Sequence, residues 1–335
     1  MTSPSPTSQP AIDFVFTWCD GADPEFIRRK NDRLHSAGAQ AGTEDNIGAV
    51  RYREHGELRY ALRSVYQYAP WFSHIYLVTD RQKPAWLKEH SKISVIDHSE
   101  IIPRELLPTF SSVCIEMYLD RIPGLSKKFI YGNDDTMIGR PLSPSDFFPG
   151  GGRPVVWLNE GTGPEADRAF AQKLLNDPSR RSWRGTVLRA WRLFEEKKTM
   201  RVPLYYPGHS FDAYTIGLFR DVLSKHPELL TANAAPFRTG KEISRVLFSY
   251  EMAFTFGCPK MTFGRFTALE KLKNRLLRGT VPVVCRNDLY KLERDVSILR
   301  PETFCLNNLT DDSAAEALRY CQSLFPAPAP WEKAP

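Results

Sequence analysis

Three segments decide the fold of this chain: Arg51-Tyr-Arg-Glu-His-Gly-Glu-Leu-Arg-Tyr-Ala-Leu-Arg-Ser-Val65, Ile75-Tyr-Leu-Val-Thr-Asp80 and Phe129-Ile-Tyr-Gly-Asn-Asp-Asp135. In the first, Leu58, Leu62 and Val65 are spaced i, i+4 and i+7, which predicts one buried stripe of a helix. The other two are short β-rich runs, and both end in aspartate. The stretch therefore predicts a helix followed by two strands with acidic ends.

Working outward, two more short runs have the same form. Ile12–Trp18 is followed by the turn Cys19-Asp-Gly-Ala-Asp-Pro24, and Ile93–Ile96 is followed by Asp97. Short strands separated by helical segments predict an α/β fold with a mainly parallel sheet flanked by helices. Ligands bind at the carboxyl ends of such strands, and acids there suit a hard divalent cation on a diphosphate. A single acid could equally be a turn or cap, but three acidic strand ends favour a metal-assisted enzyme acting on a sugar nucleotide.

Several other side chains are candidates for phosphate or proton chemistry. Arg59 and Arg63 lie four residues apart, so they share a helix face and could bind one anion together. His209 follows Pro207-Gly208 and so lies on a turn, which suits a general base. Arg238 precedes a predicted helix and is either a phosphate ligand or a surface arginine. The spacing around Glu116 does not show which way that side chain points.

Composition narrows the class of protein. The chain has 335 residues, of which 42% are hydrophobic and 25% charged, and these shares exclude wholesale disorder. The net charge of +6 favours an anionic partner without choosing among phosphorylated substrates, acidic glycans and membranes. Six cysteines without a C-x-x-C pair argue against a disulfide framework and a zinc site. No basic pattern with interleaved aromatic residues occurs, so no nucleic-acid partner is expected.

No apolar stretch approaches the roughly 20 residues that span a bilayer, and the first ten residues lack the features of a signal peptide. We therefore expect a cytoplasmic protein, with the inner face of the cell membrane left open. A basic amphipathic helix is predicted within residues 165–201, and a second basic piece follows at Lys260–Arg278. Such helices can contact a membrane surface or an acidic polymer, or can pack by their aromatic stripe.

These features predict a division of the chain. Residues 1–11 are expected to form a disordered tail and 12–150 a nucleotide-sugar-binding α/β core. A basic helical insertion would follow at 151–201, after a glycine-rich loop. Residues 202–322 would complete the catalytic core with acceptor-side helices, and 323–335 would form an extended, Pro-rich tail.

Four blocks, in this order, resemble the Stealth family of bacterial capsule and exopolysaccharide hexose-1-phosphate transferases, which also includes the catalytic part of N-acetylglucosamine-1-phosphotransferase. They are Ile12–Pro24, Arg51–Asp135, Pro207-Gly-His209 with Phe237-Arg238, and Cys305-Leu-Asn-Asn308. The chain departs from the family pattern at Cys19, at Gly132, which interrupts the strand before Asn133, and at Asn308, where an aspartate is usual.

The resemblance implies a nucleotide-sugar-transferase-like fold and transfer of a sugar 1-phosphate from a UDP-sugar, either a UDP-N-acetylhexosamine or a UDP-hexose, to a glycan hydroxyl. The product would be a phosphodiester in capsule or cell-surface polysaccharide, with release of UMP. The implied roles are as follows: Asp134, Asp135 and Asn307 hold Mg²⁺ or Mn²⁺; His209, Asp135 and Arg238 are catalytic; Thr17, Asp20, Gly21, Arg59, Arg63, Glu116, Asn133 and Asn307 bind substrate.

Two other functions remain open at this point. A metal-dependent glycosyltransferase would use similar acids but release UDP, and a non-catalytic glycan-binding protein would release no nucleotide. The number of subunits is not predicted by the sequence.

Overall fold

The structure is a computed structural model that describes residues 10–37, 47–160, 169, 173, 183–263, 283–285, 288–306 and 309–334. Its strands are β1 (Ile12–Thr17), β2 (Ile75–Thr79), β3 (Ile93–Asp97), β4 (Lys128–Asn133), β5 (Thr136–Ile138), β6 (Val156–Glu160), β7 (Tyr205–Tyr206), β8 (Asp212–Thr215), β9 (Lys260–Phe263), β10 (Val283–Cys285) and β11 (Thr303–Cys305).

The α-helices are α1 (Pro24–Ala37), α3 (Glu57–Tyr68), α4 (His98–Ile101), α5 (Ser112–Glu116), α6 (Pro144–Phe147), α8 (Trp183–Lys198), α9 (Ile216–Lys225), α10 (Glu228–Ala232), α11 (Val246–Tyr250), α13 (Leu289–Leu299) and α14 (Asp311–Leu324). The short helices are η2 (Ala49–Tyr52), η3 (Arg104–Leu106), η4 (Leu119–Arg121), η5 (Pro149–Gly151) and the π-helix η6 (Glu251–Thr255).

The central sheet has five strands in the order β3-β2-β1-β4-β8. Its first four strands are parallel, and β8 joins the edge of β4 in the antiparallel sense. β1 lies in the middle, and its first five residues are all buried, as expected for a strand covered on both faces. The predicted α/β fold with a mainly parallel sheet is confirmed.

The register of the sheet brings the strand ends together. Thr17 at the end of β1 lies opposite Val78 of β2 on one side and Asn133 of β4 on the other. The chain then turns through Asp134 and Asp135 into β5, which belongs to a separate sheet with the order β10-β11-β5. Since β11 pairs with β5, the C-terminal part of the chain returns to the aspartate turn.

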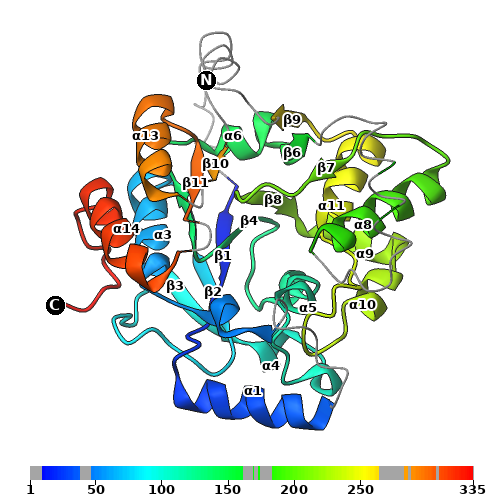
Figure 1. The fold of residues 1–335 in the computed structure, drawn as a ribbon. Coiled ribbons are helices and arrows are strands. Elements are labelled where there is room, and N and C mark those ends of the chain that lie inside the picture. Colours follow the sequence, from blue (N-terminus) through cyan, green and yellow to red (C-terminus); the bar gives the residue numbers. More distant parts are fainter. Residues whose placement is uncertain are drawn as a thin grey trace, which may run out of the picture.

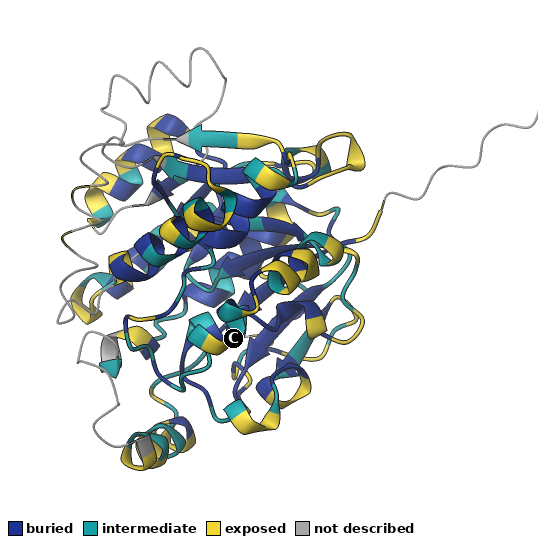
Figure 2. Cartoon of the chain, turned by 90° about the vertical axis from the view of Figure 1, so that its right-hand side faces the viewer, coloured by how far each residue is buried: buried dark blue, intermediate teal, exposed yellow. Residues whose placement is uncertain are grey.

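Helices cover both faces of the central sheet. In Figure 1, α3, α13 and α14 lie on one side and α8 to α11 on the other. The predicted stripe of α3 is confirmed, because Leu58, Leu62 and Val65 are all buried. Figure 2 shows the result, with buried residues on the strands and on the inner sides of the helices.

The described part of the predicted basic helix, α8, packs by its apolar side. Val187, Leu188, Trp191 and Phe194 are buried in the same core as β1 and β4, whereas Arg192 is exposed. Packing by the apolar stripe is thus confirmed for α8 from Val187 onward, whereas Trp183 at its start is exposed. Most of residues 165–182, and the piece from residue 264 to 278, lie outside the described residues. The predicted domain boundaries stay predictions.

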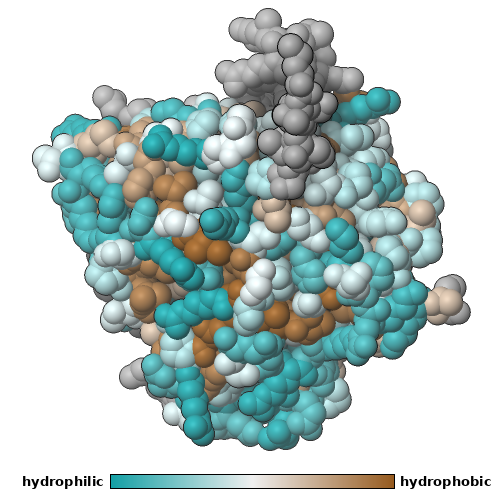
Figure 3. Space-filling model, turned by 180° about the vertical axis from the view of Figure 1, so that it is seen from behind, coloured by the Kyte–Doolittle hydropathy of each residue, from teal (hydrophilic) through white to brown (hydrophobic). Residues whose placement is uncertain are grey.

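The surface mixes polar and apolar groups. On the face seen in Figure 3, hydrophobic residues reach the surface in strips between hydrophilic side chains. No helix in the described part of the chain is both long enough and apolar enough to cross a bilayer. The contact of the basic helices with a membrane stays a prediction.

Gly132, which departs from the family pattern, has a clear packing role. A Cβ atom at this position would lie 2.4 Å from Cε1 of Phe211. The Phe211 ring packs edge-on against Phe14 and Phe16 of β1 at centroid distances of 5.5 and 5.8 Å. Glycine at residue 132 therefore leaves room for the Phe211 ring to pack over β4 and fill the core beneath the strand end.

The C-terminal segment after α14 corrects two predictions. Residues 325–334 do not form a free extended tail, because Phe325, Ala329 and Trp331 are buried. Arg63 donates two hydrogen bonds of 2.7 Å to the carboxylate of Glu332 and is buried there.

Arg59 shares that helix face, as predicted, but its Nε lies 3.7 Å from Glu332 Oε2 and its guanidinium stacks over Trp86. Both arginines thus contact the C-terminal segment, and neither lines the cavity at the strand ends. Arg63 is committed to Glu332, whereas phosphate binding by Arg59 stays a prediction.

We predict that Glu332→Ala lowers the free energy of unfolding by about 3 kcal/mol, because it leaves the buried Arg63 guanidinium without its counter-charge. Urea unfolding checks this, with the exposed Glu316→Ala on α14 as control. In Arg63→Met/Glu332→Ala the loss should be smaller than the sum of the two single losses. Strict additivity would contradict the pairing.

Candidate functional site

A cavity of about 590 Å³ opens at the carboxyl ends of β1 and β4. It lies where the aspartate turn, the segment before α3 and the loop before β8 meet. Six of the predicted site residues line it: Thr17, Asn133, Asp134, Asp135, His209 and Arg238. The tertiary structure thus brings together side chains that lie up to 221 positions apart in the sequence.

Acidic side chains gather at this cavity: Asp134, Asp135 and Glu57 line it, and Glu54 lies near them without lining it. Burial, and then the charges of Asp135, Glu57 and Glu54, raise the pKa of Asp134 well above its ordinary value. Burial and the charge of Glu57 raise the pKa of Glu54 to about 7. These side chains therefore concentrate negative charge that a cation in the cavity would stabilise.

The turn that carries Asp134 and Asp135 is held by the chain's C-terminal part. Leu306 donates its backbone N–H to the carbonyl oxygen of Asp135 at 3.0 Å, and the Cys305 thiol donates to Asp135 Oδ2 at 3.2 Å. Thr136 donates to the other carboxylate oxygen at 3.4 Å. These contacts fix the direction of the Asp135 side chain.

A tyrosine joins the ends of β1 and β4 beneath the cavity. The Tyr131 hydroxyl lies 3.0 Å from Thr17 Oγ1 and donates to Asn133 Oδ1 at 3.1 Å. Tyr131 is itself fully buried. Two predicted substrate-binding side chains are therefore held in fixed positions by one buried residue.

Arg245 lies behind this layer and neutralises two carboxylates. Its Nη1 is 2.6 Å from Asp212 Oδ2 and its Nε is 3.6 Å from Glu116 Oε2. Burial lowers the pKa of Arg245, but Asp212 and Glu116 outweigh that effect and raise it overall. Glu116, predicted to bind substrate, is not among the residues that line the cavity. It contacts Arg245 and Tyr131 instead.

A second part of the lining forms an aromatic wall. Phe26, Tyr52 and Phe110 line the cavity, and Phe237 stacks on Phe110 with centroids 5.3 Å apart and ring planes 8° apart. The backbone anchors this wall, because Phe110 donates its N–H to the carbonyl oxygen of Pro236 at 2.7 Å. The wall offers flat apolar surface of the size of a nucleobase.

The turn after β1 supports this aromatic wall. Gly21 donates its N–H to the carbonyl oxygen of Tyr52 at 2.8 Å, and a Cβ atom at Gly21 would lie 2.3 Å from that oxygen. Asp20 accepts from the backbone N–H of Ala22 within the turn. Neither Asp20 nor Gly21 lines the cavity. Their contact with a nucleoside stays a prediction, and the structure gives both a place in the turn that supports the aromatic residues.

Burial lowers the pKa of His209 below its ordinary value, although the charge of Asp135 opposes the shift. The imidazole is therefore neutral at pH 7 and able to accept a proton. Arg238 donates to the Ser112 hydroxyl, and no carboxylate in the described part of the chain lies within ion-pair distance of it. Its charge is directed to the cavity.

Sequence reasoning missed several cavity residues: Tyr52, Arg51, Arg53, His55 and Glu57. All lie just before or at the start of α3, within the most extensive family block. The i, i+4 spacing favoured Arg59 and Arg63 instead, which lie four and eight residues after His55. The run of charged residues from Arg51 to Glu57 could have indicated that this segment lines the site. Asn307 and Asn308 lie outside the described residues.

The side chains that line the cavity include ligands suited to a divalent cation. Asp134 and Asp135 supply hard carboxylate oxygens, the ligands that Mg²⁺ prefers. Within the described residues, no three His, Cys, Asp or Glu side chains already converge as a complete metal site. The remaining ligands of such an ion would have to come from substrate oxygens and water, which is usual for Mg²⁺ on a diphosphate.

Two solved structures align with most of this chain. A galactosyltransferase LgtC in complex with donor and acceptor sugar analogs is 12% identical, with a TM-score of 0.44, covering 96% of this chain and 97% of that one. An apo structure of the bifunctional glycosyltransferase WbbM is 10% identical at the same TM-score, covering 98% of this chain and 51% of that one. These scores are too low to assign a fold.

Family models and relatives give a clear result. The model of Stealth protein conserved region 1 matches residues 10–38, and that of conserved region 2 matches residues 51–155. An exopolysaccharide phosphotransferase of Streptomyces coelicolor is 32% identical over 96% of this chain, which covers 52% of that relative.

The exopolysaccharide phosphotransferase CpsY of Mycobacterium tuberculosis is 33% identical over 96% of this chain, which covers 58% of it. The chain thus spans about half the length of several of these relatives. The capsular polysaccharide phosphotransferase WcwK of Streptococcus pneumoniae is 30% identical, covering 90% of this chain and 98% of its own length. From these matches, this chain belongs to the Stealth family, whose relatives here are exopolysaccharide and capsular polysaccharide phosphotransferases.

Proposed function

We propose that this protein transfers a sugar 1-phosphate from a UDP-sugar to a hydroxyl group of a glycan acceptor, with release of UMP. The observation that carries the proposal is the convergence of two aspartates, a neutral histidine and an arginine on one cavity. Phosphoryl transfer needs mainly positioning and neutralisation of developing charge, which such a set of groups can supply. The names of the relatives, all phosphotransferases, support the same reaction class.

The nucleotide would bind across the cavity with its base on the aromatic wall of Phe26, Tyr52 and Phe110. Stacking on such rings stabilises a base without demanding its identity. The diphosphate would then point toward the acidic turn and Arg238, whose planar guanidinium matches two phosphate oxygens. Thr17 and Asn133, both held by Tyr131, are further polar groups of the lining.

Asp134 and Asp135 would hold a Mg²⁺ or Mn²⁺ ion on the diphosphate, with Asn307 as a further ligand of the proposed site. When bound, such an ion neutralises charge on the transferring phosphoryl group and on the leaving UMP. The closeness of Glu54 and Glu57 to this turn supports a cation there, because their charges raise the pKa of Asp134.

The bond that breaks is the P–O–P bridge. The acceptor oxygen forms a bond to the β-phosphorus, the bridging oxygen leaves with UMP, and the acceptor proton passes to an unprotonated nitrogen of His209. A neutral imidazole near this centre suits that transfer. Arg238 would stabilise charge on the phosphoryl oxygens during the step.

We predict that UMP, and not UDP, is the nucleotide product. The purified protein would be incubated with Mg²⁺, a panel of UDP-hexoses and UDP-N-acetylhexosamines, and a capsular glycan fraction, and the nucleotides separated. UMP together with a new phosphodiester in the glycan is the expected result. UDP would mean that the sugar–phosphate bond breaks, as in an ordinary glycosyltransferase, and would overturn the proposal.

Asp134→Asn should lower turnover by about 10²–10³-fold, the usual range for one electrostatic stabiliser. In metal-free buffer at pH 7.5 the same variant should melt at a higher temperature than the wild type, because it removes one of several crowded negative charges. Mg²⁺ should raise the melting temperature of the wild type more than that of the variant. The exposed Asp221→Asn on α9 is the control, and equal Mg²⁺ shifts in both variants would contradict the assignment.

His209→Gln should lower turnover by about 10²–10⁴-fold, as expected for a lost general base. The wild-type rate should rise with pH along a limb centred below 6.5, because the lowered pKa keeps the imidazole unprotonated at lower pH than usual. That limb should be missing in the variant, while exposed His35→Gln keeps it. An unchanged rate or an unchanged acid limb in His209→Gln would exclude His209 as the base.

A further inference from the structure

A second cavity, of about 730 Å³, lies beside the first at the carboxyl ends of β2 and β3. Its walls come from α1, from the residues that follow β2, and from the segment between α4 and Pro108. Asp80 and His98 line both cavities. A ligand that extends out of the first cavity at this point would therefore enter the second.

The lining of the second cavity is positively charged. It contains five arginines and three aspartates, which gives a net charge of +2 with His98 neutral. Burial lowers the pKa of His98 to about 4, and its Nδ1 has no hydrogen-bond partner although the residue is buried. An anion in this cavity would meet an excess of guanidinium groups and an unsatisfied ring nitrogen.

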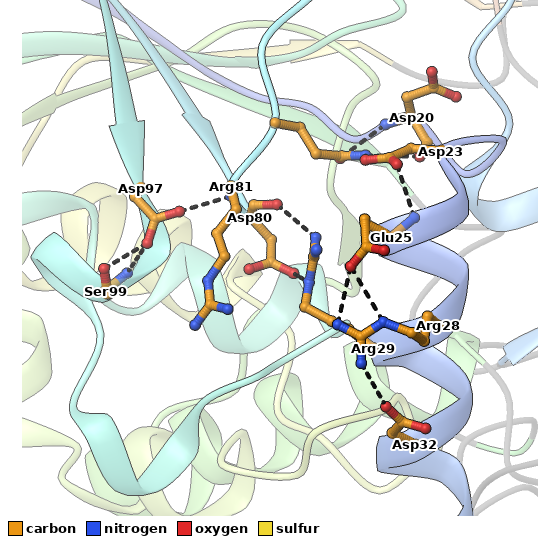
Figure 4. A network of polar contacts seen from close by, with 11 residues as sticks. Asp20, Asp23, Glu25, Arg28, Arg29, Asp32, Asp80, Arg81, Asp97 and Ser99 are labelled. Atoms are coloured by element: carbon orange, nitrogen blue, oxygen red, sulfur yellow. Dashed lines mark hydrogen bonds and ion pairs between the residues drawn. The ribbon is translucent and has the colours of Figure 1, made fainter.

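The three aspartates already have partners. Asp32 accepts from Arg28 at 3.1 Å and Asp80 from Arg29 at 3.0 Å. Asp97 caps α4 through Ser99 and accepts the backbone N–H of Arg81 at 2.7 Å. Figure 4 shows these contacts running from α1 across to the end of β3.

Three arginines of this lining have no acidic partner in the part of the chain that the structure describes: Arg33, Arg81 and Arg104. The Arg33 Nε is buried without an acceptor. Arg81 has a φ of 56°, in the left-handed region that favours glycine and asparagine, and its guanidinium has no dashed contact in Figure 4. An arginine kept at a strained position, with its charge unpaired, points to a ligand.

The side chains of the lining indicate which kind of anion the cavity would bind. Among the described residues that line it, the His98 imidazole is the only aromatic ring, so a second nucleotide would find no phenyl, phenol or indole side chain for its base. Guanidinium groups bind phosphate oxygens well, and the shared Asp80 and His98 connect the cavity to the site of transfer.

We infer that this arginine cavity is an acceptor subsite for a phosphodiester group in a glycan already extended by an earlier transfer. The inference rests on the proposed function, because it is that transfer which leaves a phosphodiester near the end of the growing chain. The substrate class would then be a phosphodiester-linked glycan rather than a neutral one, and the arginine cavity would favour repeated transfer to the same chain.

Two probes test this without any turnover: a dihexosyl phosphodiester and the matching neutral dihexoside, each titrated calorimetrically into the protein without donor. The variant is Arg33→Gln/Arg81→Gln/Arg104→Gln. The control is Arg121→Gln/Arg192→Gln/Arg319→Gln, which removes the same charge from three exposed arginines that line neither cavity.

The phosphodiester should bind wild type and control alike, and at least about tenfold more weakly to the variant, as for the loss of charge-assisted hydrogen bonds. Binding of UDP-sugar with Mg²⁺ should be equal in all three proteins. In the transfer assay, the variant should show a raised KM for a phosphodiester-containing acceptor with an unchanged kcat.

Equal phosphodiester affinity in variant and control, or no preference of the wild type for the phosphodiester over the neutral probe, would overturn the inference. So would a second equivalent of UDP that is lost in the variant, since the cavity would then be a nucleotide site. These outcomes leave the UMP measurement untouched. A failure of transfer together with arginine-dependent phosphodiester binding would sink the proposed function while the anion site stands.

Discussion

Crowded negative charge at the end of β4 is the constraint on which the rest of the site depends. Asp134 and Asp135 lie on one turn, and the charges of Asp135, Glu57 and Glu54 raise the pKa of Asp134. The charge of Glu57 also raises the pKa of Glu54. Such a turn would relax away from its neighbours if the chain around it were loose. It is held instead by Leu306 and Cys305, which come from the far end of the chain.

Aromatic packing beneath the strand ends holds the negatively charged turn in place. Gly132 leaves room for the Phe211 ring, which packs against β1 and closes the core directly under the aspartate turn. Tyr131 and Arg245 form the next layer, where polar groups are paired before they reach the cavity. The polar residues that face the cavity are consequently fixed by neighbours that are buried and hydrogen-bonded, which is the condition for a preorganised site.

The arginines divide into two groups by what they meet. Arg63 and Arg245 are enclosed and paired with carboxylates, so they stabilise the folded chain rather than bind a ligand. Arg238, and on the neighbouring cavity Arg33, Arg81 and Arg104, meet no carboxylate at ion-pair distance in the described residues. Both cavities lie along the carboxyl ends of the parallel strands of the central sheet, so anionic groups of donor and acceptor could be bound side by side.

The sequence by itself determined the local elements and the candidates at the strand ends. Short β-rich runs predicted β1, β2, β3 and β4, and apolar spacing predicted the buried stripe of α3. The motif order predicted that Asp134, Asp135, His209 and Arg238 belong together. These features are local, or are carried by residues whose chemistry is recognisable in isolation.

Only the tertiary structure decided what each helix face meets. The spacing of Arg59 and Arg63 is the same whether their partner is a phosphate or Glu332, which lies 269 positions beyond Arg63. In the same way, nothing near Glu116 shows that Arg245 will neutralise it, and the Pro-rich composition of the C-terminal segment does not show that Trp331 is buried. Helical periodicity reports which residues share a face, but the partner of that face depends on long-range packing, which no local pattern contains.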